Sequence, residues 1–258
     1  GARSARGEPP LDALRLFATN APAEGLNRDR MIAQVGQLTG RSWWLPRAPP
    51  PAGGEGPSTF TNEPYVFNAV DVMRGGGEHA LDNCPAPRQL YLCVGARVMC
   101  LKNLGTNLAN GSIGTVASVT LQNQARGKVA VDVVVTFDGL LGNPPLSHTF
   151  RTHDPDAPDD LTNKFTIRGS DNKEKASRIQ IPLRLAWACS IHKSQGMSLD
   201  RVVINFDRCF EDGQAYTALS RVRSLQGAWL LNLQLRHMSM VSKRAKQWYN
   251  DLVVEKWE

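Results

Sequence analysis

Short apolar runs alternate with polar loops over the last third of the chain, and this alternation most constrains the fold. Residues 185–188, 202–206 and 228–233 each have the length and composition of a strand buried on both faces. Between the last two runs, apolar residues recur at three- and four-residue spacings over 213–222, a pattern typical of a helix. The order strand, loop, strand, helix, strand predicts an α/β fold with a parallel sheet.

The polar loop after the first of these runs predicts a ligand site. Ligands of open α/β sheets bind beyond the carboxyl ends of the strands. We expect Ser190 to cap a single helical turn there. The residues that follow supply an imidazole, a cation, a hydroxyl, an amide and a pliable glycine backbone: His192, Lys193, Ser194, Gln195 and Gly196.

Two arginines on the helix at 213–222 extend this prediction. Arg221 and Arg223 project from its polar faces. A planar guanidinium can neutralise the charge spread over phosphoryl oxygens during transfer, which an ammonium does less well. The two segments together favour a site that handles phosphate groups.

The amino-acid sequences of these segments resemble those of a known family. SIHKSQGMSLD (190–200) and GQAYTALSRVRSLQG (213–227) resemble motifs V and VI of superfamily 1 DNA helicases, most closely those of the Pif1 family. LFATNAPAEGLNRDRM (16–31) resembles the opening of that family's second motor domain. LCVGARVMCLKNL (92–104) and LANGSIGTVASV (108–119) resemble the stretch leading into its inserted domain. The resemblance covers about residues 11–233 in the same order.

The resemblance implies a fold class and a division into domains. It implies a RecA-like parallel sheet, the second motor domain of a helicase, with an inserted small SH3-like β-barrel. Residues 1–10 are then a linker or edge, 11–101 the first part of the RecA-like domain with a flexible Pro/Gly loop at 45–62, 102–181 the insert, and 182–258 the second part with a C-terminal helix. We expect Ser239 to cap that helix and one face of it to pack on the motor domain. We expect the stretch 74–87 to be a solvent-exposed loop.

The resemblance also implies roles for individual residues. Arg221 is expected to be catalytic, as an arginine finger on the γ-phosphate of ATP. ATP binding is expected from Gln195, Gly196, Gln214 and Arg221. DNA binding is expected from Thr19, Asn20, Lys102, His192, Lys193 and Ser194, and no residue is expected to bind a metal.

Each residue also has a purely structural interpretation that the sequence leaves open. Arg221 and Arg223 can be surface arginines in ordinary ion pairs. Asn20 can cap the helix that begins there, and Lys102 lies next to residues that suit tight turns. A lone histidine such as His192 is more often structural than catalytic.

Composition limits the function in several ways. No G-x-x-x-x-G-K-[ST] phosphate loop occurs, so by the resemblance ATP and Mg²⁺ would be bound mainly by a preceding motor domain. The net charge of +6 suits nucleic acid. The five cysteines include no C-x-x-C pair and indicate neither a zinc site nor a disulfide framework. No apolar run reaches the roughly 20 residues that span a bilayer.

The leading hypothesis is therefore the C-terminal part of an ATP-dependent 5′ to 3′ DNA helicase of the Pif1 type, inactive without its N-terminal motor domain. Expected partners are single-stranded DNA, duplex or fork DNA and that motor domain, with no membrane and a monomeric state. The family suggests the nucleus or the mitochondrion. Two alternatives are a non-enzymatic nucleic-acid-binding scaffold and a RecD-like superfamily 1 motor.

Overall fold

The computed structural model divides the chain into two compact units, which are described separately. One comprises Gly1–Asn27 with Trp187–Glu258, and the other Arg28–Ala186. The structure describes residues 8–40, 64–75, 77, 79–105, 107–123, 129–139, 144–152 and 163–254.

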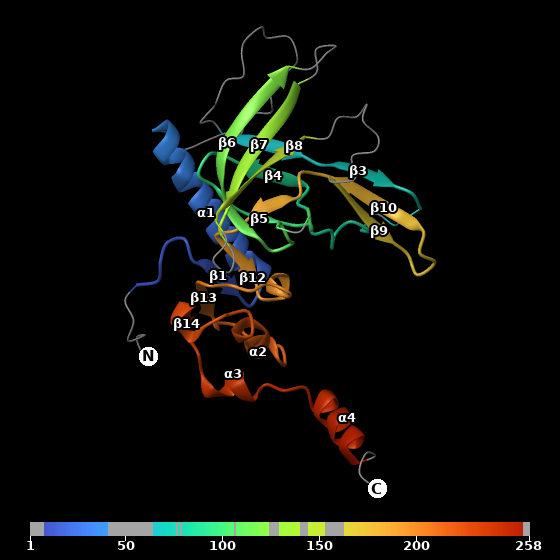
Figure 1. Cartoon of the computed structure of the whole chain (residues 1–258). Coiled ribbons are helices and arrows are strands. Elements are labelled where there is room, and N and C mark those ends of the chain that lie inside the picture. Colours follow the sequence, from blue (N-terminus) through green and yellow to red (C-terminus); the bar gives the residue numbers. More distant parts are fainter. Residues whose placement is uncertain are drawn as a thin grey trace. The chain divides into compact units, whose positions relative to one another are not determined.

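A parallel sheet of four strands forms the centre of the first unit (Figure 1). Its order is β12 (Ala188–Ser190), β1 (Leu14–Phe17), β13 (Val202–Asn205) and β14 (Ala228–Leu231). In β13 the successive residues Val202, Val203 and Ile204 are at most 1% exposed, as a strand covered on both faces requires. The predicted α/β fold with a parallel sheet is confirmed.

Helices and turns connect these strands. They are α1 (Asn20–Thr39), η2 (His192–Ser194), α2 (Gln214–Leu219), η3 (Leu225–Gly227), α3 (Leu235–Ser239) and α4 (Lys243–Val254). Helix α1 begins at the predicted residue and contributes residues to both units. Helix α2 begins one residue after Gly213 and ends at Leu219, so it is shorter than the pattern predicts.

The apolar run at 185–188 is not one strand, and that prediction was wrong. Strand β11 (Leu183–Leu185) ends inside it and belongs to the second unit, whereas β12 begins only at Ala188. The Ala186 N–H bonds to Arg97, and the Trp187 carbonyl accepts from Arg15 on β1. An unbroken apolar run therefore serves two sheets. Ser190 ends β12 and caps nothing, because the N-cap residue of η2 is Ile191.

The second unit is built from antiparallel strands (Figure 1). Strands β2 (Tyr65–Asn68) and β4 (Gln89–Leu92) form a pair. Three strands have the order β3 (Val70–Met73), β10 (Glu174–Ile179), β9 (Lys164–Arg168). Five have the order β11, β5 (Arg97–Cys100), β6 (Ile113–Asn123), β7 (Val129–Phe137), β8 (Leu146–Arg151). Short runs at 97–101, 114–121, 128–137 and 162–167, separated by Gly, Asn and Asp residues that suit turns, predict strands, and β5, β6, β7 and β9 lie there.

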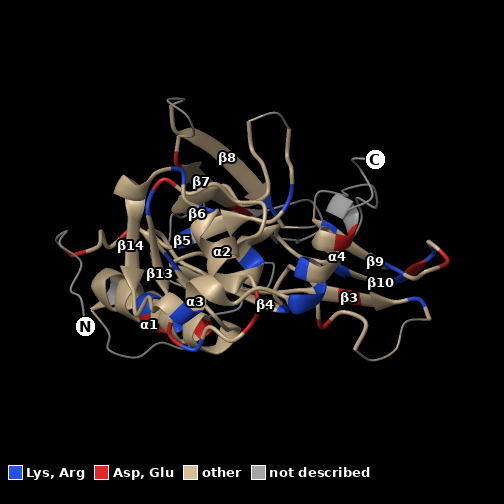
Figure 2. Ribbon diagram, turned by 90° about the horizontal axis from the view of Figure 1, so that it is seen from below, with Lys and Arg blue, Asp and Glu red and all other residues tan. Residues whose placement is uncertain are grey.

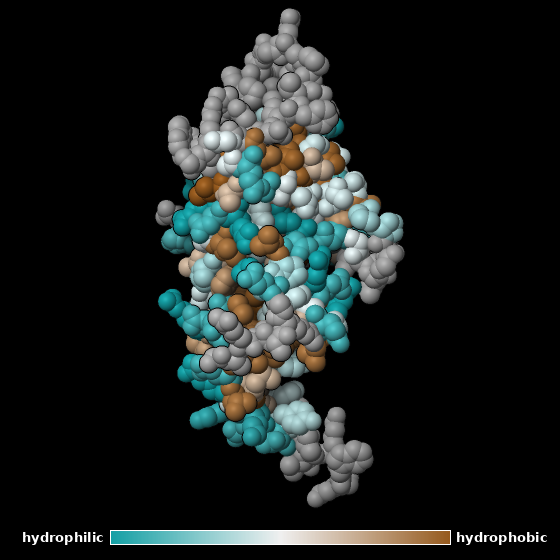
Figure 3. All heavy atoms as spheres, turned by 90° about the vertical axis from the view of Figure 1, so that its left-hand side faces the viewer, coloured by the Kyte–Doolittle hydropathy of each residue, from teal (hydrophilic) through white to brown (hydrophobic). Residues whose placement is uncertain are grey.

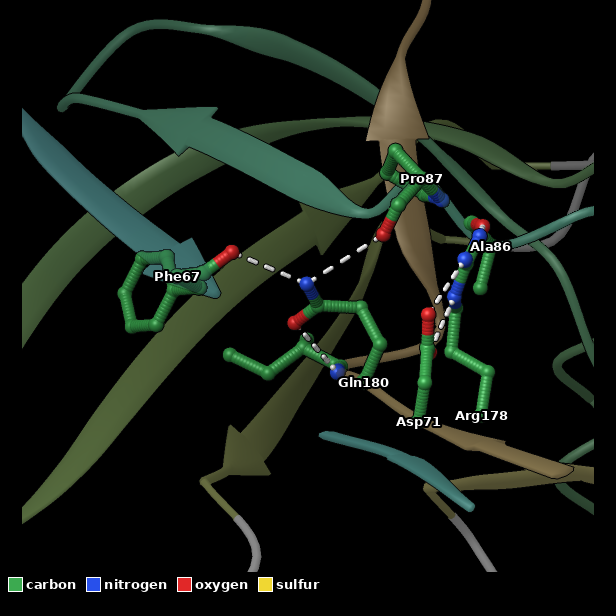
Figure 4. A network of polar contacts seen from close by, with 7 residues as sticks. Phe67, Asp71, Ala86, Pro87, Arg178 and Gln180 are labelled. Carbon is green, nitrogen blue, oxygen red and sulfur yellow. Dashed lines mark hydrogen bonds and ion pairs between the residues drawn. The ribbon is translucent and has the colours of Figure 1, made fainter. Parts of the chain in front are cut away.

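A buried polar network links strands of the second unit (Figure 4). The Arg178 guanidinium on β10 donates to both Asp71 carboxylate oxygens, at 2.7 and 2.8 Å, and to the Ala86 carbonyl at 2.9 Å. Gln180 donates to the Phe67 carbonyl at 2.9 Å and accepts from the Ile181 N–H at 3.0 Å. The hydrogen bond from Arg178 lowers the pKa of Asp71, although burial of the carboxyl opposes that shift.

The compact units do not coincide with the expected domain borders. Strands β2 to β5 precede residue 102 and lie in the second unit. The assignment of 102–181 as an inserted domain therefore stays a prediction. The stretch 74–87 is exposed only in part, because Ala86 is fully buried beside Leu101 and Phe165. Most of residues 1–10 and all of the loop at 45–62 lie outside the described residues.

The C-terminal helix differs from its prediction at its start and on its surface. Helix α4 begins at Lys243, and the Ser242 hydroxyl accepts from the Ala245 N–H at 3.3 Å, so Ser242 takes the capping position expected for Ser239. Trp248 and Tyr249 are each 64% exposed, so the expected packing of an apolar face is absent from the described part of α4. Figure 3 shows a face of the molecule on which groups of hydrophobic residues lie among hydrophilic ones.

Candidate functional site

The carboxyl ends of β1 and β12 bring most of the predicted site residues to one edge of the parallel sheet. Thr19 and Asn20 follow β1, and the predicted loop follows β12. The two ends are joined directly, because the Ile191 N–H donates to the Phe17 carbonyl at 2.8 Å. Parallel strands that start at the same edge also end together, and this end of the sheet is where such folds bind ligands.

The loop after β12 turns tightly and presents polar side chains outward. Its single 3₁₀ turn, η2, exposes His192 and Lys193. Gln195 and Gly196 are also exposed, and Gly196 has φ +81°, a left-handed conformation that favours glycine. The cation of Lys193 and the amide of Gln195 therefore both lie on exposed residues of this loop.

Ser194 differs from its neighbours in this loop. It is 0% exposed, and its hydroxyl donates to the Ile191 carbonyl at 2.6 Å. In this conformation the hydroxyl stabilises the turn and does not face a ligand. The sequence pattern alone did not distinguish this inward side chain from the outward ones beside it.

His192 has a partner that sequence reasoning missed. Its Nε2 atom lies 2.6 Å from a carboxylate oxygen of Glu211, which precedes α2. Both side chains are about half exposed, at 53% and 43%. The two residues are 19 positions apart, so no local pattern marks them as a pair.

Arg221 is held at the end of α2 by three acceptors. Its Nε donates to the Thr217 carbonyl at 3.2 Å, and its Nη2 donates to the Ser220 hydroxyl at 3.0 Å. Its Nη1 donates to the Met197 carbonyl at 3.2 Å, in the loop after β12. The guanidinium thus connects the two segments that the sequence singled out.

Backbone pairing joins the same two segments. Leu199 and Val222 form a parallel bridge. The Leu199 N–H donates to the Arg221 carbonyl at 2.8 Å, and the Arg223 N–H donates to the Leu199 carbonyl at 3.1 Å. Arg223 also forms an ion pair with Asp200 at 3.2 Å. Arg223 therefore matches the structural alternative left open for it, while Arg221 forms no ion pair with a described residue.

Gln214 and Lys102 have structural partners of their own. Gln214 is 4% exposed, and its amide donates to the Ala18 carbonyl at 2.9 Å and accepts from the Phe210 N–H at 3.3 Å. It therefore ties α2 to the end of β1. Lys102 belongs to the second unit, where its Nζ donates to the Lys164 carbonyl at 2.6 Å and lies over the Phe165 ring.

The donors at this edge suit phosphate oxygens. Arg221 and Lys193 are cationic, and Gln195 is neutral. In Figure 2 the α2 region and α4 carry Lys and Arg residues. Among the described residues, no three His, Cys, Asp or Glu side chains gather where they could hold a metal ion. The described helices include none long and apolar enough to cross a membrane.

Comparison with known families gives one match within the second unit. Residues 79–119 match the model of the 2B domain of the DNA helicase Pif1. The match covers β4, β5 and the start of β6.

Relatives and a solved structure extend the similarity over most of the chain. The ATP-dependent DNA helicase PIF1 of Mus musculus is 40% identical over 170 residues, which cover 65% of this chain and 23% of that protein. The PIF1 of Emericella nidulans is 30% identical over 278 residues, which cover 94% of this chain and 33% of that protein. The crystal structure of the Pif1 helicase from Candida albicans is similar with a TM-score of 0.59 and 27% identity, over 95% of this chain and 50% of that one. The chain thus spans about a quarter to a third of the length of these two relatives.

Proposed function

Because this chain belongs to the Pif1 family of superfamily 1 helicases, we propose that it is the second motor region of an ATP-dependent DNA helicase that moves 5′ to 3′ along single-stranded DNA. In this role it supplies an arginine finger and part of the DNA track to a longer protein. The relatives are named ATP-dependent DNA helicases, and the chain matches about a third or less of their length.

One observation carries the proposal. Arg221 reaches across from α2 to the Met197 carbonyl in the loop after β12, while Leu199 and Val222 pair beside it. A residue that senses phosphate is thereby connected to a loop that exposes His192 and Lys193. A motor requires such a connection, because nucleotide binding must change how the protein holds its track.

The nucleotide part of the site is incomplete in this chain. ATP would supply the phosphoryl group that is hydrolysed, with Mg²⁺ held by the preceding motor domain. Arg221 would contact the γ-phosphate and neutralise charge as it develops. Gln195 and Gly196 would lie beside the nucleotide, and Gln214 would contribute by fixing the start of α2 against β1.

The DNA part of the site is proposed to follow the same edge of the sheet. Thr19 and Asn20 after β1, and His192 and Lys193 on η2, would contact backbone phosphates. Ser194 would contribute by stabilising the turn that presents its neighbours. Lys102, on the second unit, would add a further contact.

The finer features of the fold and setting are proposals on the same basis. Residues 102–181 would form the SH3-like insert, to which β6, β7 and β8 contribute an antiparallel sheet. The helicase would act as a monomer on single-stranded and forked DNA, in the nucleus or the mitochondrion.

Binding of this chain to a fluorescent single-stranded oligonucleotide tests the DNA proposal. Anisotropy titrations over a range of salt concentrations should give an affinity that falls as salt rises. Lys193→Ala should weaken binding and reduce the slope of log affinity against log salt by about one unit. Lys173→Ala removes the same charge from an exposed turn between β9 and β10 and should change neither value. If the two variants had the same affinity and the same salt slope, Lys193 would not be a DNA contact.

A further inference from the structure

We propose that Ser220 is a positioning residue, which orients the Arg221 guanidinium so that its outer edge can bind phosphate. The proposal rests on the function proposed for Arg221 and adds a residue to it. Ser220 would touch no substrate itself. It would act only through the arginine next to it in the chain.

The Ser220 hydroxyl is bonded as both donor and acceptor. It donates to the Thr217 carbonyl at 2.9 Å and accepts from Nη2 of Arg221 at 3.0 Å. The Thr217 carbonyl also accepts from Nε of Arg221 at 3.2 Å. The hydroxyl therefore closes a ring of hydrogen bonds that fixes one side of the guanidinium on the last turn of α2.

The Met197 carbonyl fixes the guanidinium from the other segment. It accepts from Nη1 at 3.2 Å, so Nε, Nη1 and Nη2 each donate one hydrogen bond. A guanidinium has five N–H groups. After these bonds to described residues, one N–H remains on Nη1 and one on Nη2. Two N–H groups on neighbouring nitrogens of one guanidinium can donate to two oxygens of a phosphate.

Loss of the Ser220 hydroxyl should therefore release one side of this arrangement. Nη2 would lose its acceptor, and the guanidinium would rotate more freely about its last side-chain bonds. Charge stabilisation in a transition state depends on donors that are already in place. The effect should appear in the rate of the chemical step more than in ATP binding, which would depend mainly on the preceding domain.

A simpler interpretation is that Ser220 only satisfies a carbonyl at the end of a helix. Serine often bonds backwards to a carbonyl in this way. Such a role would change stability without acting through Arg221. Ser224, an exposed serine four residues later, makes no capping bond to η3 and offers a matched control.

The experiment measures DNA-stimulated ATP hydrolysis by the complete gene product that contains this chain. Ser220→Ala should lower kcat about fivefold to tenfold with the KM for ATP unchanged. Ser220→Thr keeps the hydroxyl and should restore most of the rate, and Ser224→Ala should match the wild type. In an Arg221→Ala background, Ser220→Ala should have no further effect, because the two residues act as one unit.

Each result separates this inference from the function on which it rests. Full activity of Ser220→Ala beside a strongly reduced but measurable rate of Arg221→Ala would overturn the inference and leave the arginine finger in place. An additional loss from Ser220→Ala in the Arg221→Ala background would also overturn it, since Ser220 would then act independently. Full activity of Arg221→Ala would instead refute the proposed function of Arg221. Circular dichroism and thermal melting of each variant show whether folding is retained.

Discussion

Arg178 and Lys175 lie three residues apart on β10 and form ion pairs of different kinds. Arg178 has a side chain only 9% exposed and binds Asp71 through two nitrogens. Lys175 pairs with Asp171 at 3.1 Å, and both side chains are over a third exposed. Arg178→Ala removes the hydrogen-bond donor of the partly exposed Asp71 carboxylate and of the buried Ala86 carbonyl, and should cost about 2 kcal/mol of unfolding free energy. Lys175→Ala should change it by about 0.5 kcal/mol or less. Urea unfolding of both variants measures the difference, and similar losses would show that burial of the pair is unimportant.

The same pair predicts how stability depends on pH. The Arg178 hydrogen bond lowers the pKa of Asp71 in the folded chain below its value in the unfolded chain. The folded state therefore binds fewer protons at this group, so its contribution is present above the unfolded pKa of about 3.9 and is lost as pH falls through the folded pKa. The stability gap between the wild type and Asp71→Asn should be constant from pH 7 to 5 and should shrink below pH 4. Urea unfolding at each pH tests this, and a gap that widens in acid would contradict the assignment.

Individual site residues were predictable where their partners are local. Arg221 takes two of its three acceptors from Thr217 and Ser220, so the helical pattern already placed them together. Asp71 and Arg178 are 107 residues apart, and His192 and Glu211 are 19 apart. No spacing in the sequence marks such pairs, because they depend on how strands and loops assemble.

At the scale of elements, the entry into β14 depends on a close approach at Gly227. A Cβ atom there would overlap the carbonyl oxygen of Asp200 and lie 2.8 Å from its carbonyl carbon. The backbone must shift to accept a methyl group, so Gly227→Ala should destabilise the chain by about 3 kcal/mol. Gly25 lies inside α1 with no heavy atom within 4 Å of an added Cβ, so Gly25→Ala should stabilise it by about 0.5 to 1 kcal/mol. Thermal melting compares the two, and a neutral Gly227→Ala would show that the contact relaxes easily.

Elements with one dominant local signal were predicted well, and those that depend on tertiary context were not. Strands β13 and β14 follow from apolar runs, and the start of α1 follows from a helix-initiating Asn20. The run at 185–188 has the composition of a strand, yet it crosses between two sheets. Apolar composition reports that a segment is buried, but it does not report which neighbours it pairs with. The start of α4 was misplaced because two serines, Ser239 and Ser242, can each cap a helix.

At the scale of the whole molecule, the parallel sheet was predictable and the division of the chain was not. The sheet follows from the order of the apolar runs, and each run can be recognised within a short stretch of sequence. The compact units are divided at Asn27 and Arg28 and again at Ala186 and Trp187, inside a helix and inside an apolar run. The second place lacks the Pro, Gly or polar composition that usually marks a boundary, and the first, although polar, lies within a continuous helix. The borders at 102 and 181 that the family resemblance implies are not borders of these compact units.

The absence of a phosphate-cradling loop from the sequence predicts the activity of the isolated chain. A γ-phosphate needs Mg²⁺, backbone N–H donors and a lysine around it as well as an arginine. This chain contributes the arginine, Arg221, and exposed polar residues at the end of a sheet, but its sequence contains no phosphate-cradling loop. We therefore expect no phosphate release above background from the isolated chain with ATP, Mg²⁺ and single-stranded DNA, although the chain should bind that DNA in the anisotropy assay. The complete gene product should hydrolyse ATP under the same conditions. Phosphate release by the isolated chain that disappears in Arg221→Ala would show a complete ATP site here, whereas release that persists in the variant would indicate a contaminating enzyme.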